Sequence, residues 1–361
     1  MRTPRTVDIA ITGRCNLRCS YCSHFTGHGD VNNDLPADEW LRFFRELNRC
    51  AVMDVILQGG EPFCRKDFKK LLEGIIKNRM RFSILTNGTL ITQENAAFIA
   101  ETRRCDVVQV SIDGSIPVTH DAFRGKGNFF RAIRGIENLK SKSVPVTVRV
   151  TIHKENVREL ESIAKLLLED LGLQSFSTNA ASYMGLCRSN TRLVQLSVKE
   201  RSFAMKALKE LNRKYEGRIT AAAGPLAEAE IWNRMIKGSG NNRPEQPGGG
   251  YLSACSGPFD TIGVRSDGIM VPCIQLSHIE LGRVNKDDLQ HIWTHHPQLS
   301  RLRTRHLIEL KNFEFCKGCQ FIMNCTGNCP ALAYTLVGKE NHPSPDACLK
   351  RFLEQGGTLP E

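Results

Sequence analysis

From residue 7 to about residue 215, short and mostly apolar runs alternate with amphipathic stretches. The apolar runs predict six strands: VDIAIT (7–12), MDVILQ (53–58), RFSILT (81–86), DVVQVSI (106–112), VTVRVTI (146–152) and LQSFST (173–178). The stretches between them predict helices, because apolar residues recur there at i, i+3, i+4 and i+7. Two such faces are Trp40, Phe43, Phe44 and Leu47, and Leu160, Ile163, Ala164, Leu167 and Leu171 with Gly172 as the stop signal.

Strands separated by helices indicate βαβ units and a parallel sheet. Six such units predict an α/β fold, a partial (β/α)6 TIM-like barrel over residues 1–215, rather than a closed eight-fold barrel. In barrels of this kind, catalytic groups collect on the loops at the carboxyl ends of the strands. We therefore expect the chemistry of this chain on those loops.

The hydrophobic pattern changes after GSGNNRPEQPGGG (238–250), and we expect a linker region over residues 216–250. FDTIGV and IMVPC flank the turn sequence RSDG (265–268), which predicts a β-hairpin with Gly268 at its turn. Short helical stretches such as DDLQHIWTHH (287–296) follow. These features predict a small cysteine-rich domain over residues 251–352 and a tail over residues 353–361.

Composition and cysteine placement narrow the class of protein. The 361 residues contain no apolar run near the roughly 20 residues that span a bilayer, and the basic start lacks a signal core. We therefore expect a cytoplasmic protein without a membrane anchor, in which cysteines bind metal or do redox chemistry. Of its 14 cysteines, three lie at 15–22 and seven between Cys255 and Cys348. The other four, Cys50, Cys64, Cys105 and Cys187, are expected to be small core residues.

The formal net charge of +11 raises the question of an acidic partner. Basic residues are spread along the chain, and only RLRTRH (301–306) is dense. We interpret that run first as a solvated surface, then as a surface for an acidic peptide or substrate, and last as a nucleic-acid site.

Three cysteines spaced Cys15-x3-Cys19-x2-Cys22 follow the first strand directly. A structural zinc ion or an ordinary iron–sulfur cluster takes four protein ligands, so three leave one position open unless a distant residue completes the site. The spacing, with Tyr21 before the last cysteine, resembles the signature of the radical S-adenosylmethionine (SAM) superfamily. The resemblance implies a [4Fe–4S] cluster whose open iron binds SAM. It also implies an external one-electron reductant of the flavodoxin or ferredoxin type, and a 5′-deoxyadenosyl radical that abstracts hydrogen from the substrate.

Motifs after the next strands support the same resemblance. In QGGEP (58–62), it places Gly59, Gly60 and Glu61 against the amino group of SAM. It also implies that Ser111 reaches the ribose and that Asn87 and Asp113 shape the pocket floor. Arg149 is expected to pair with the SAM carboxylate, with a structural ion pair as the alternative.

The downstream cysteines resemble the SPASM domain, which holds two auxiliary [4Fe–4S] clusters. The resemblance assigns Cys255, Cys273 and Cys329 to the nearer auxiliary cluster, and Cys316, Cys319, Cys325 and Cys348 to the outer one. Because relatives place another cysteine where this chain has Thr261, the nearer cluster has either an open iron or a borrowed ligand such as Cys187 or Asp260. Zinc ribbons are the alternative reading of the CxxC pair.

The resemblance fixes the class of reaction but not the substrate. We favour the modification of a ribosomally made peptide, by crosslinking or side-chain oxidation. The first strand begins at about residue 7, which leaves no room for a leader-recognition module, so a separate recognition protein is expected among the partners. The alternatives are the oxidation, decarboxylation or epimerisation of a small molecule such as a sugar, and anaerobic sulfatase maturation.

Sulfatase maturation is disfavoured, because Ile274 and His24 stand where those enzymes usually carry Asp and Tyr. The non-enzymatic alternative is a zinc-binding, RNA-associated protein. No general base is assigned; His24, Tyr183 and Cys187 are candidates for positioning the substrate or moving a proton.

Overall fold

The computed structural model describes residues 2–23, 33–238, 248–253, 255 and 257–361. Its strands form one sheet in the order β10-β9-β8-β1-β2-β3-β4-β5-β6-β7. They are β1 (Thr6–Thr12), β2 (Asp54–Gly59), β3 (Arg81–Thr86), β4 (Cys105–Ser111), β5 (Val146–Ile152), β6 (Phe176–Ala180), β7 (Ile219–Ala221), β8 (Thr261–Val264), β9 (Ile269–Val271) and β10 (Gly282–Arg283). All neighbours from β8 through β1 to β7 pair in parallel, which confirms the predicted α/β partial barrel.

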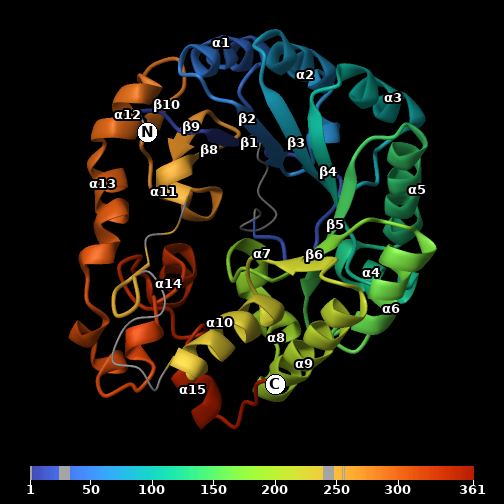
Figure 1. Ribbon diagram of the computed structural model, residues 1–361. Helices are drawn as coiled ribbons and strands as arrows, with labels where there is room; N and C mark the ends of the chain where they lie inside the picture. Colours follow the sequence, from blue (N-terminus) through green and yellow to red (C-terminus); the bar gives the residue numbers. More distant parts are fainter. Residues whose placement is uncertain (1, 24–32, 239–247, 254, 256) are drawn as a thin grey trace.

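Helices wrap the outside of the curved sheet, with α1 to α5 forming an arc around β1 to β5 (Figure 1). The helices are α1 (Ala37–Arg49), α2 (Phe68–Lys77), α3 (Gln93–Thr102), α4 (Pro117–Arg124), α5 (Asn128–Ser141), α6 (Leu160–Lys165), α7 (Gly185–Ser189), α8 (Thr191–Val194), α9 (Val198–Lys214), α10 (Pro225–Gly238), α11 (Gly257–Asp260), α12 (Leu289–His295), α13 (Pro297–Arg303), α14 (Pro330–Val337) and α15 (Leu349–Glu354). A π-helical turn, Leu166–Asp170, continues α6, and Gly172 ends it with φ +58° as predicted.

Each barrel strand has an apolar outer face and a more polar inner face. Their outward residues are apolar and form the core with the helices; in β1, for example, Val7, Ile9 and Ile11 have no exposed surface. The predicted face of α1 packs there, because all four of its large apolar side chains are fully buried. The alternate residues, such as Asp8, face the inside of the barrel and are more often polar. The lumen is therefore lined by groups that can bind a polar ligand.

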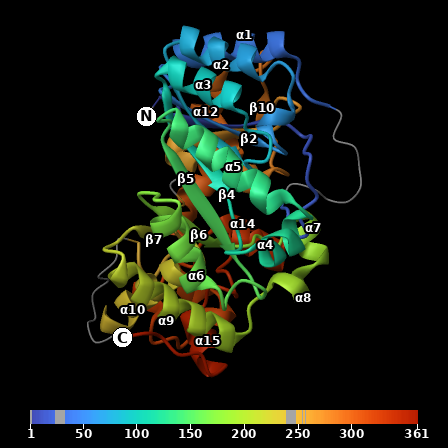
Figure 2. The same cartoon turned by 90° about the vertical axis from the view of Figure 1, so that its right-hand side faces the viewer.

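The sheet contains two short strands that the sequence did not predict, β7 and β10. β7 spans only three residues and pairs with β6 at the edge of the sheet. Beyond it, α9, α10 and α15 lie together near the C-terminus (Figure 2). They share a second small core, in which the rings of Trp232 and Phe352 are 4.8 Å apart.

The predicted hairpin is confirmed, since β8 and β9 pair in antiparallel fashion and Gly268 at the turn has φ +84°. The hairpin does not stand apart from the barrel. β8 pairs with β1 from Thr6 opposite Thr261 to Ile9 opposite Val264, so the cysteine-rich region begins as an extension of the barrel sheet. The domain limits at residues 215, 250 and 352 remain a prediction.

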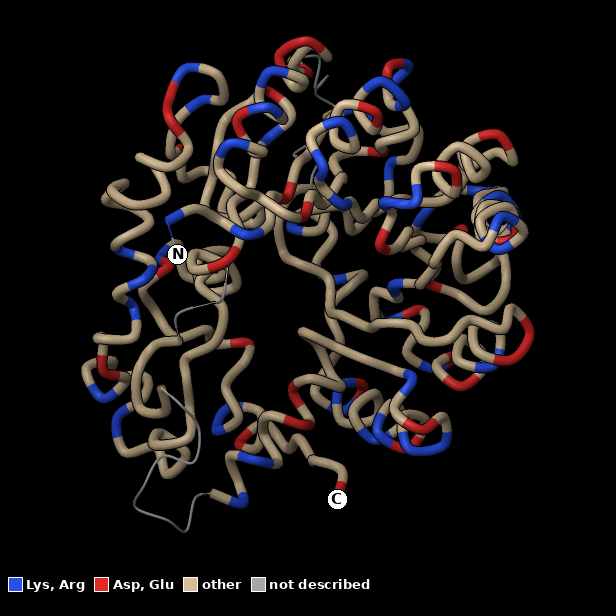
Figure 3. The backbone as a smooth tube through the Cα atoms, turned by 45° about the horizontal axis from the view of Figure 1, so that its top comes forward, with Lys and Arg blue, Asp and Glu red and all other residues tan. Residues whose placement is uncertain are grey.

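The basic run 301–306 is not the solvated surface that we expected first. Arg305 is fully buried, and the Arg303 guanidinium donates to the carbonyl oxygens of Pro258 and Trp293 at 2.7 and 2.6 Å. Arg301 pairs with Glu340. Elsewhere Lys and Arg alternate with Asp and Glu around the molecule (Figure 3). Among the described residues, no helix combines the length and apolar character needed to cross a membrane.

Candidate active site

The loop that leaves β1 carries Cys15, Cys19 and Cys22, and all three thiols line one cavity at the carboxyl ends of the strands. Burial raises the pKa of Cys15 to about 12 and that of Cys19 to about 11, and in each case another thiol of the loop adds to the effect. Thiols that resist ionisation in the bare protein need a positive partner to become thiolates, and a bound metal centre supplies one. The donor set therefore fits an iron–sulfur cluster.

Gly59 and Gly60 hold the start of this loop. The Gly60 amide donates to the carbonyl oxygen of Thr12 at 2.8 Å. A Cβ atom on Gly60 would lie 2.1 Å from the carbonyl oxygen of Arg14, and one on Gly59, which has φ +138°, would lie 2.2 Å from that of Thr12. The sequence suggested that these glycines let a ligand approach; the close approach that the structure displays is to the backbone of the cysteine loop.

Glu61 lies behind the cavity wall and does not line the cavity. Its carboxylate accepts hydrogen bonds from the Asn87 amide and the Thr86 hydroxyl, both at 2.7 Å. Burial raises the pKa of Glu61 to about 7, although these donors act in the opposite direction. The expectation that its side chain contacts SAM is therefore not supported by this placement, because Glu61 instead ties the end of β2 to the end of β3.

The cavity has a volume of about 270 Å³ and brings together six of the eight side chains or glycines predicted to bind SAM. These are Tyr21, Gly59, Gly60, Asn87, Ser111 and Arg149. The other two, Glu61 and Asp113, are fully buried outside its lining. Polar lining residues that sequence reasoning missed are Ser23, Gln58, Thr86, Gln109, Arg124, Thr151, Asn179, Ser182 and Gln275.

Arg149 meets the requirement for binding a carboxylate. Its Nε atom contacts the Ser177 hydroxyl at 3.4 Å, and the described residues include no ion pair of this arginine. Burial lowers its pKa from the ordinary value. The alternative that Arg149 serves a structural ion pair therefore finds no partner in the described chain, and its charge faces the cavity.

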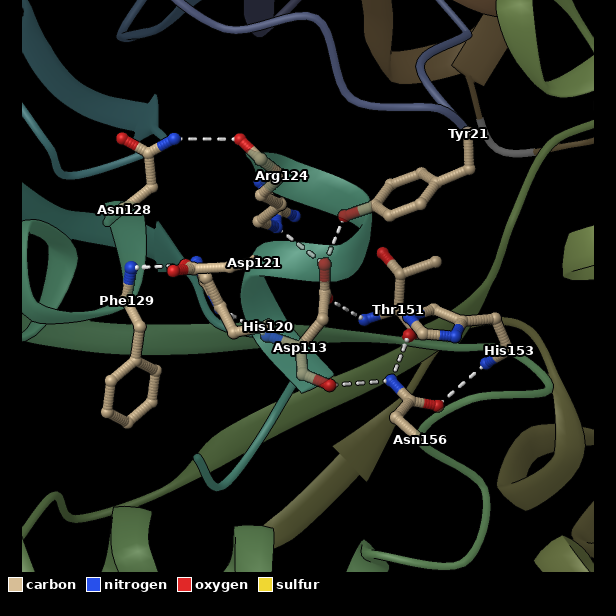
Figure 4. A network of polar contacts seen from close by, with 10 residues as sticks. All are labelled: Tyr21, Asp113, His120, Asp121, Arg124, Asn128, Phe129, Thr151, His153 and Asn156. Atoms are coloured by element: carbon tan, nitrogen blue, oxygen red, sulfur yellow. Dashed lines mark hydrogen bonds and ion pairs between the residues drawn. The ribbon is translucent and has the colours of Figure 1, made fainter. Parts of the chain in front are cut away.

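Asp113 is the centre of a buried polar network next to the cysteine loop (Figure 4). Its carboxylate forms an ion pair with Arg124 at 2.5 Å and accepts from the Tyr21 hydroxyl and, at 2.8 Å, from the Thr151 amide. Burial acts to raise the pKa of Asp113, but the charge of Arg124 outweighs it and holds the pKa below its ordinary value. The network joins the cysteine loop to α4 and β5, so Asp113 supports the cavity floor from behind.

His153 borders the same network, and its ring is held by packing. The ring lies 4.0 Å from that of Phe123, and within the described part of the chain neither ring nitrogen has a hydrogen-bond partner. Burial lowers the pKa of His153 to about 4, against the charge of Asp113. The ring is therefore neutral and acts as packing at neutral pH.

Of the three candidates for substrate or proton handling, the two within the described residues, Tyr183 and Cys187, do not line the cavity. Cys187 is fully buried, and its backbone amide donates to the carbonyl oxygen of Cys22 at 3.4 Å. Tyr183 packs with it, and neither residue lines the cavity. Cys187 therefore lies beside the first cysteine loop, which contradicts its use as a borrowed ligand of the nearer auxiliary cluster. His24 lies outside the described residues.

The assignment of the downstream cysteines to two clusters stays a prediction, with which the neighbours of Cys273 and Cys316 agree. Burial raises the pKa of Cys273 to about 11, and its neighbours Cys329 and Cys255 add to the effect. The pKa of Cys316 rises to about 12, again through burial and then through Cys325, Cys348 and Cys319. Within the described residues, no three metal-binding side chains converge enough to share a single ion. Ligands that surround a multi-iron cluster stand farther apart than those held about 2.3 Å from one zinc ion, so both observations fit clusters.

A second cavity of about 390 Å³ adjoins the first. The two share lining residues, namely Cys22, Ser23, Gln58, Gly59 and Gln275. From there the second cavity reaches the β8–β9 turn, where it is lined by Arg265 and Asp267. Arg265 contacts two carboxylates, Asp267 at 2.5 Å and Glu280 at 2.9 Å, so its charge is compensated. A substrate in this cavity would lie next to a ligand in the first.

Comparison with known families and relatives agrees with this arrangement. Residues 9–167 match the radical SAM superfamily, and residues 255–320 match the SPASM iron–sulfur cluster-binding domain. The chain is 28% identical over 343 residues to Fe-coproporphyrin III synthase of Methanosarcina barkeri, covering 91% of this chain and 84% of the relative. It is 26% identical over 336 residues to PqqA peptide cyclase of Ruegeria pomeroyi, covering 91% and 83%.

The fold is also that of a solved structure. SuiB of Streptococcus suis, bound to the precursor peptide SuiA, superposes with a TM-score of 0.73 at 16% identity. The similarity covers 97% of this chain and 76% of SuiB. At this identity the likeness concerns the fold alone.

Proposed function

This chain is a radical SAM enzyme with a SPASM domain, and on that premise we propose that it modifies a ribosomally made peptide, by crosslinking or by side-chain oxidation. Its cofactors are a [4Fe–4S] cluster with SAM and auxiliary [4Fe–4S] clusters. Bound together, the first cluster and SAM supply a radical that abstracts a hydrogen atom, which is chemistry that the cofactor carries and the protein orients.

In this proposal each group of residues in the site has a role. Cys15, Cys19 and Cys22 hold the first cluster, and Arg149 holds the carboxylate of SAM. The two downstream sets of cysteines hold the auxiliary clusters, with three thiols for the nearer and four for the outer. Asp113 keeps Arg124 and Tyr21 in place beside the cysteine loop.

The lining of the second cavity is the observation that carries the peptide proposal. It offers neutral hydrogen-bonding side chains, such as Asn33, Gln58 and Gln275, which suit the amide groups of a peptide backbone. Among its described lining residues Arg265 is the cation, and two carboxylates already compensate it. A polar lining in which the one described cation is compensated, next to the cofactor cavity, favours a peptide segment over a substrate with several carboxylates.

The relatives support two substrate classes. The names PqqA peptide cyclase and SuiB with its precursor peptide support a peptide. The name Fe-coproporphyrin III synthase supports a small molecule, here a tetrapyrrole. A tetrapyrrole with propionate groups needs unpaired cations in its pocket, and the compensated Arg265 argues against that candidate. A cytoplasmic location, an external flavodoxin- or ferredoxin-type reductant and a separate leader-recognition protein complete the proposal.

The test begins with short peptides encoded beside the gene. The reconstituted enzyme is incubated anaerobically with SAM, a reductant and either a candidate peptide or one of a set of iron tetrapyrroles that carry propionate groups. We expect 5′-deoxyadenosine to form faster with the peptide, and the peptide to lose the mass of two hydrogen atoms. Deuterium placed on the attacked carbon should appear in 5′-deoxyadenosine. Turnover of the tetrapyrrole with no change in any peptide would overturn the proposal.

A further inference from the structure

Arg305 is a fully buried arginine whose guanidinium is only partly bonded. It lies in the short turn after α13, Thr304–Leu307, and its Nη1 atom donates to the carbonyl oxygen of Ser253. Its Nε and Nη2 atoms have no hydrogen-bond partner among the residues that the structure describes. A buried charge is retained in proteins only when paired, because leaving it uncompensated in the interior costs several kcal/mol. Two donors of Arg305 therefore lack the acceptor that their burial demands.

The electrostatic surroundings of Arg305 indicate on which side the missing acceptor is expected. Burial lowers the pKa of Arg305 to about 10, while the thiols of Cys329 and then Cys255 act to raise it. The described residues include no carboxylate within ion-pairing distance of Arg305, since Glu340 pairs instead with Arg301 and His278. The groups that act most strongly to raise the pKa of Arg305 are thus two of the three cysteines assigned to the nearer auxiliary cluster, and Cys255 lies two residues from Ser253, which Arg305 contacts.

We propose that Arg305 donates its Nε and Nη2 hydrogens to the sulfurs of the nearer auxiliary cluster and raises the reduction potential of that cluster. The inference rests on the auxiliary cluster of the proposed enzyme and not on the identity of its substrate. Hydrogen bonds to cluster sulfurs and the net charge of the site both set the potential. A cation in contact favours the reduced cluster, because reduction adds one negative charge.

The ligand count strengthens this role. A cluster held by three thiolates carries one negative charge fewer than one held by four, and Arg305 makes its surroundings more positive still. Both features ease the uptake of an electron. The outer set has four cysteines, Cys316, Cys319, Cys325 and Cys348, so the two auxiliary clusters are expected to differ in potential. The nearer one is then the better acceptor of the electron that leaves an oxidised substrate.

Arginine suits this place better than lysine. Its planar guanidinium keeps its charge when buried and presents a fork of donors, one of which is fixed by Ser253 while two remain for the cluster. Arg305→Lys keeps a positive charge but loses the fork, and Arg305→Gln loses both. Arg301→Gln is the matched control, because it removes a charge one turn earlier from a side chain that pairs with Glu340.

The experiment uses the full-length chain with Cys15, Cys19 and Cys22 replaced by alanine, so that only auxiliary clusters contribute. Reductive titration without substrate is followed by electron paramagnetic resonance. The signal that disappears in a Cys273→Ala variant belongs to the nearer cluster. At a fixed ambient potential, Arg305→Gln should lower the reduced-to-oxidised ratio of that cluster about tenfold, which corresponds to about 59 mV for one electron. Arg301→Gln should leave the ratio unchanged.

A second measurement tests the contact between Arg305 and the cluster with a variant that keeps the positive charge. With ¹⁵N in the guanidinium groups of arginine, pulsed electron paramagnetic resonance of the reduced nearer cluster should reveal a nitrogen coupling that Arg305→Lys removes. Wild-type protein without this coupling would overturn the proposal, even where Arg305→Gln fails to hold the cluster. So would an Arg305→Gln potential equal to that of Arg301→Gln. Neither result depends on whether the substrate is a peptide.

Discussion

Replacing Asp113 by asparagine removes the negative charge at the centre of the network in Figure 4 while preserving the size of the side chain. The carboxylate has no exposed surface, and its ion pair with Arg124 is 2.5 Å long. Arg124 is itself buried, so Asp113→Asn leaves a guanidinium without a counter-charge in the protein interior. Removing one partner of a buried pair typically costs about 3–5 kcal/mol.

The hydrogen bonds of Asp113 add to this figure only modestly. Asparagine retains an oxygen that can accept from the backbone amide of Thr151, which lies 2.8 Å from Oδ1 of Asp113 in the wild-type protein. The bond from the Tyr21 hydroxyl loses its charged acceptor, which weakens it by about 1 kcal/mol. We therefore expect Asp113→Asn to lower the free energy of unfolding by about 4–6 kcal/mol.

The assay is chemical unfolding of the anaerobically reconstituted protein, followed by the fluorescence of its three buried tryptophans, Trp40, Trp232 and Trp293. Arg124→Met is measured alone and together with Asp113→Asn. Because the double variant leaves no unpaired charge, it should be clearly more stable than the sum of the two single effects predicts. Single effects that simply add, or an Asp113→Asn cost below about 1 kcal/mol, would refute the role of the buried pair.

Three other predictions concern the same region. Cys19→Ala should abolish 5′-deoxyadenosine formation and remove about four irons per chain, whereas Cys187→Ala, which alters a buried neighbour of the loop, should keep the full iron content. Gly60→Ala should lower iron in the first cluster and SAM binding, because its Cβ would lie 2.1 Å from the Arg14 carbonyl oxygen. Gly127→Ala controls for backbone strain without a contact, because Gly127 has φ +80° and its Cβ would meet nothing within 4 Å. Since the pKa of His153 is about 4 in the folded chain and near 6.5 when unfolded, the unfolded state binds the extra proton below pH 6.5 and stability falls with acidity. The free energy of unfolding of the wild-type protein should therefore fall between pH 7 and pH 5, and in His153→Phe this fall should be smaller by about 2 kcal/mol. Denaturant unfolding at both pH values measures the difference.

The barrel could be predicted from the sequence because its strands are buried on the outside by regular helices. RFSILT coincides with β3, and the face of α1 is buried as its period required. The residues that line the cavity were harder to predict from the sequence. Gln109, Ser111, Arg149 and Thr151 are polar residues at every second position of β4 and β5. Their alternation marks the lumen face, but the strands were interpreted as mostly apolar runs; the resemblance pointed to Ser111 and Arg149, whereas Gln109 and Thr151 were missed.

Other features depend on tertiary contacts that no local pattern records. Glu61 sits in a conspicuous motif, yet its carboxylate is turned away from the cavity by donors that come from the end of β3. Arg305 belongs to a basic run typical of surfaces, and it is buried because the turn after α13 packs against Ser253. Cys187 is far from the first cysteines in sequence and contacts their loop only through the fold.

The parallel pairing of β8 with β1 has a mechanical consequence. The cysteine loop begins at the end of β1, and Cys273 follows the hairpin that starts with β8. Any swing of one metal-binding region away from the other would have to break that ladder of backbone hydrogen bonds. The spacing between them is thus a constant of the architecture, and substrates of different size have to be accommodated by loops at the rim.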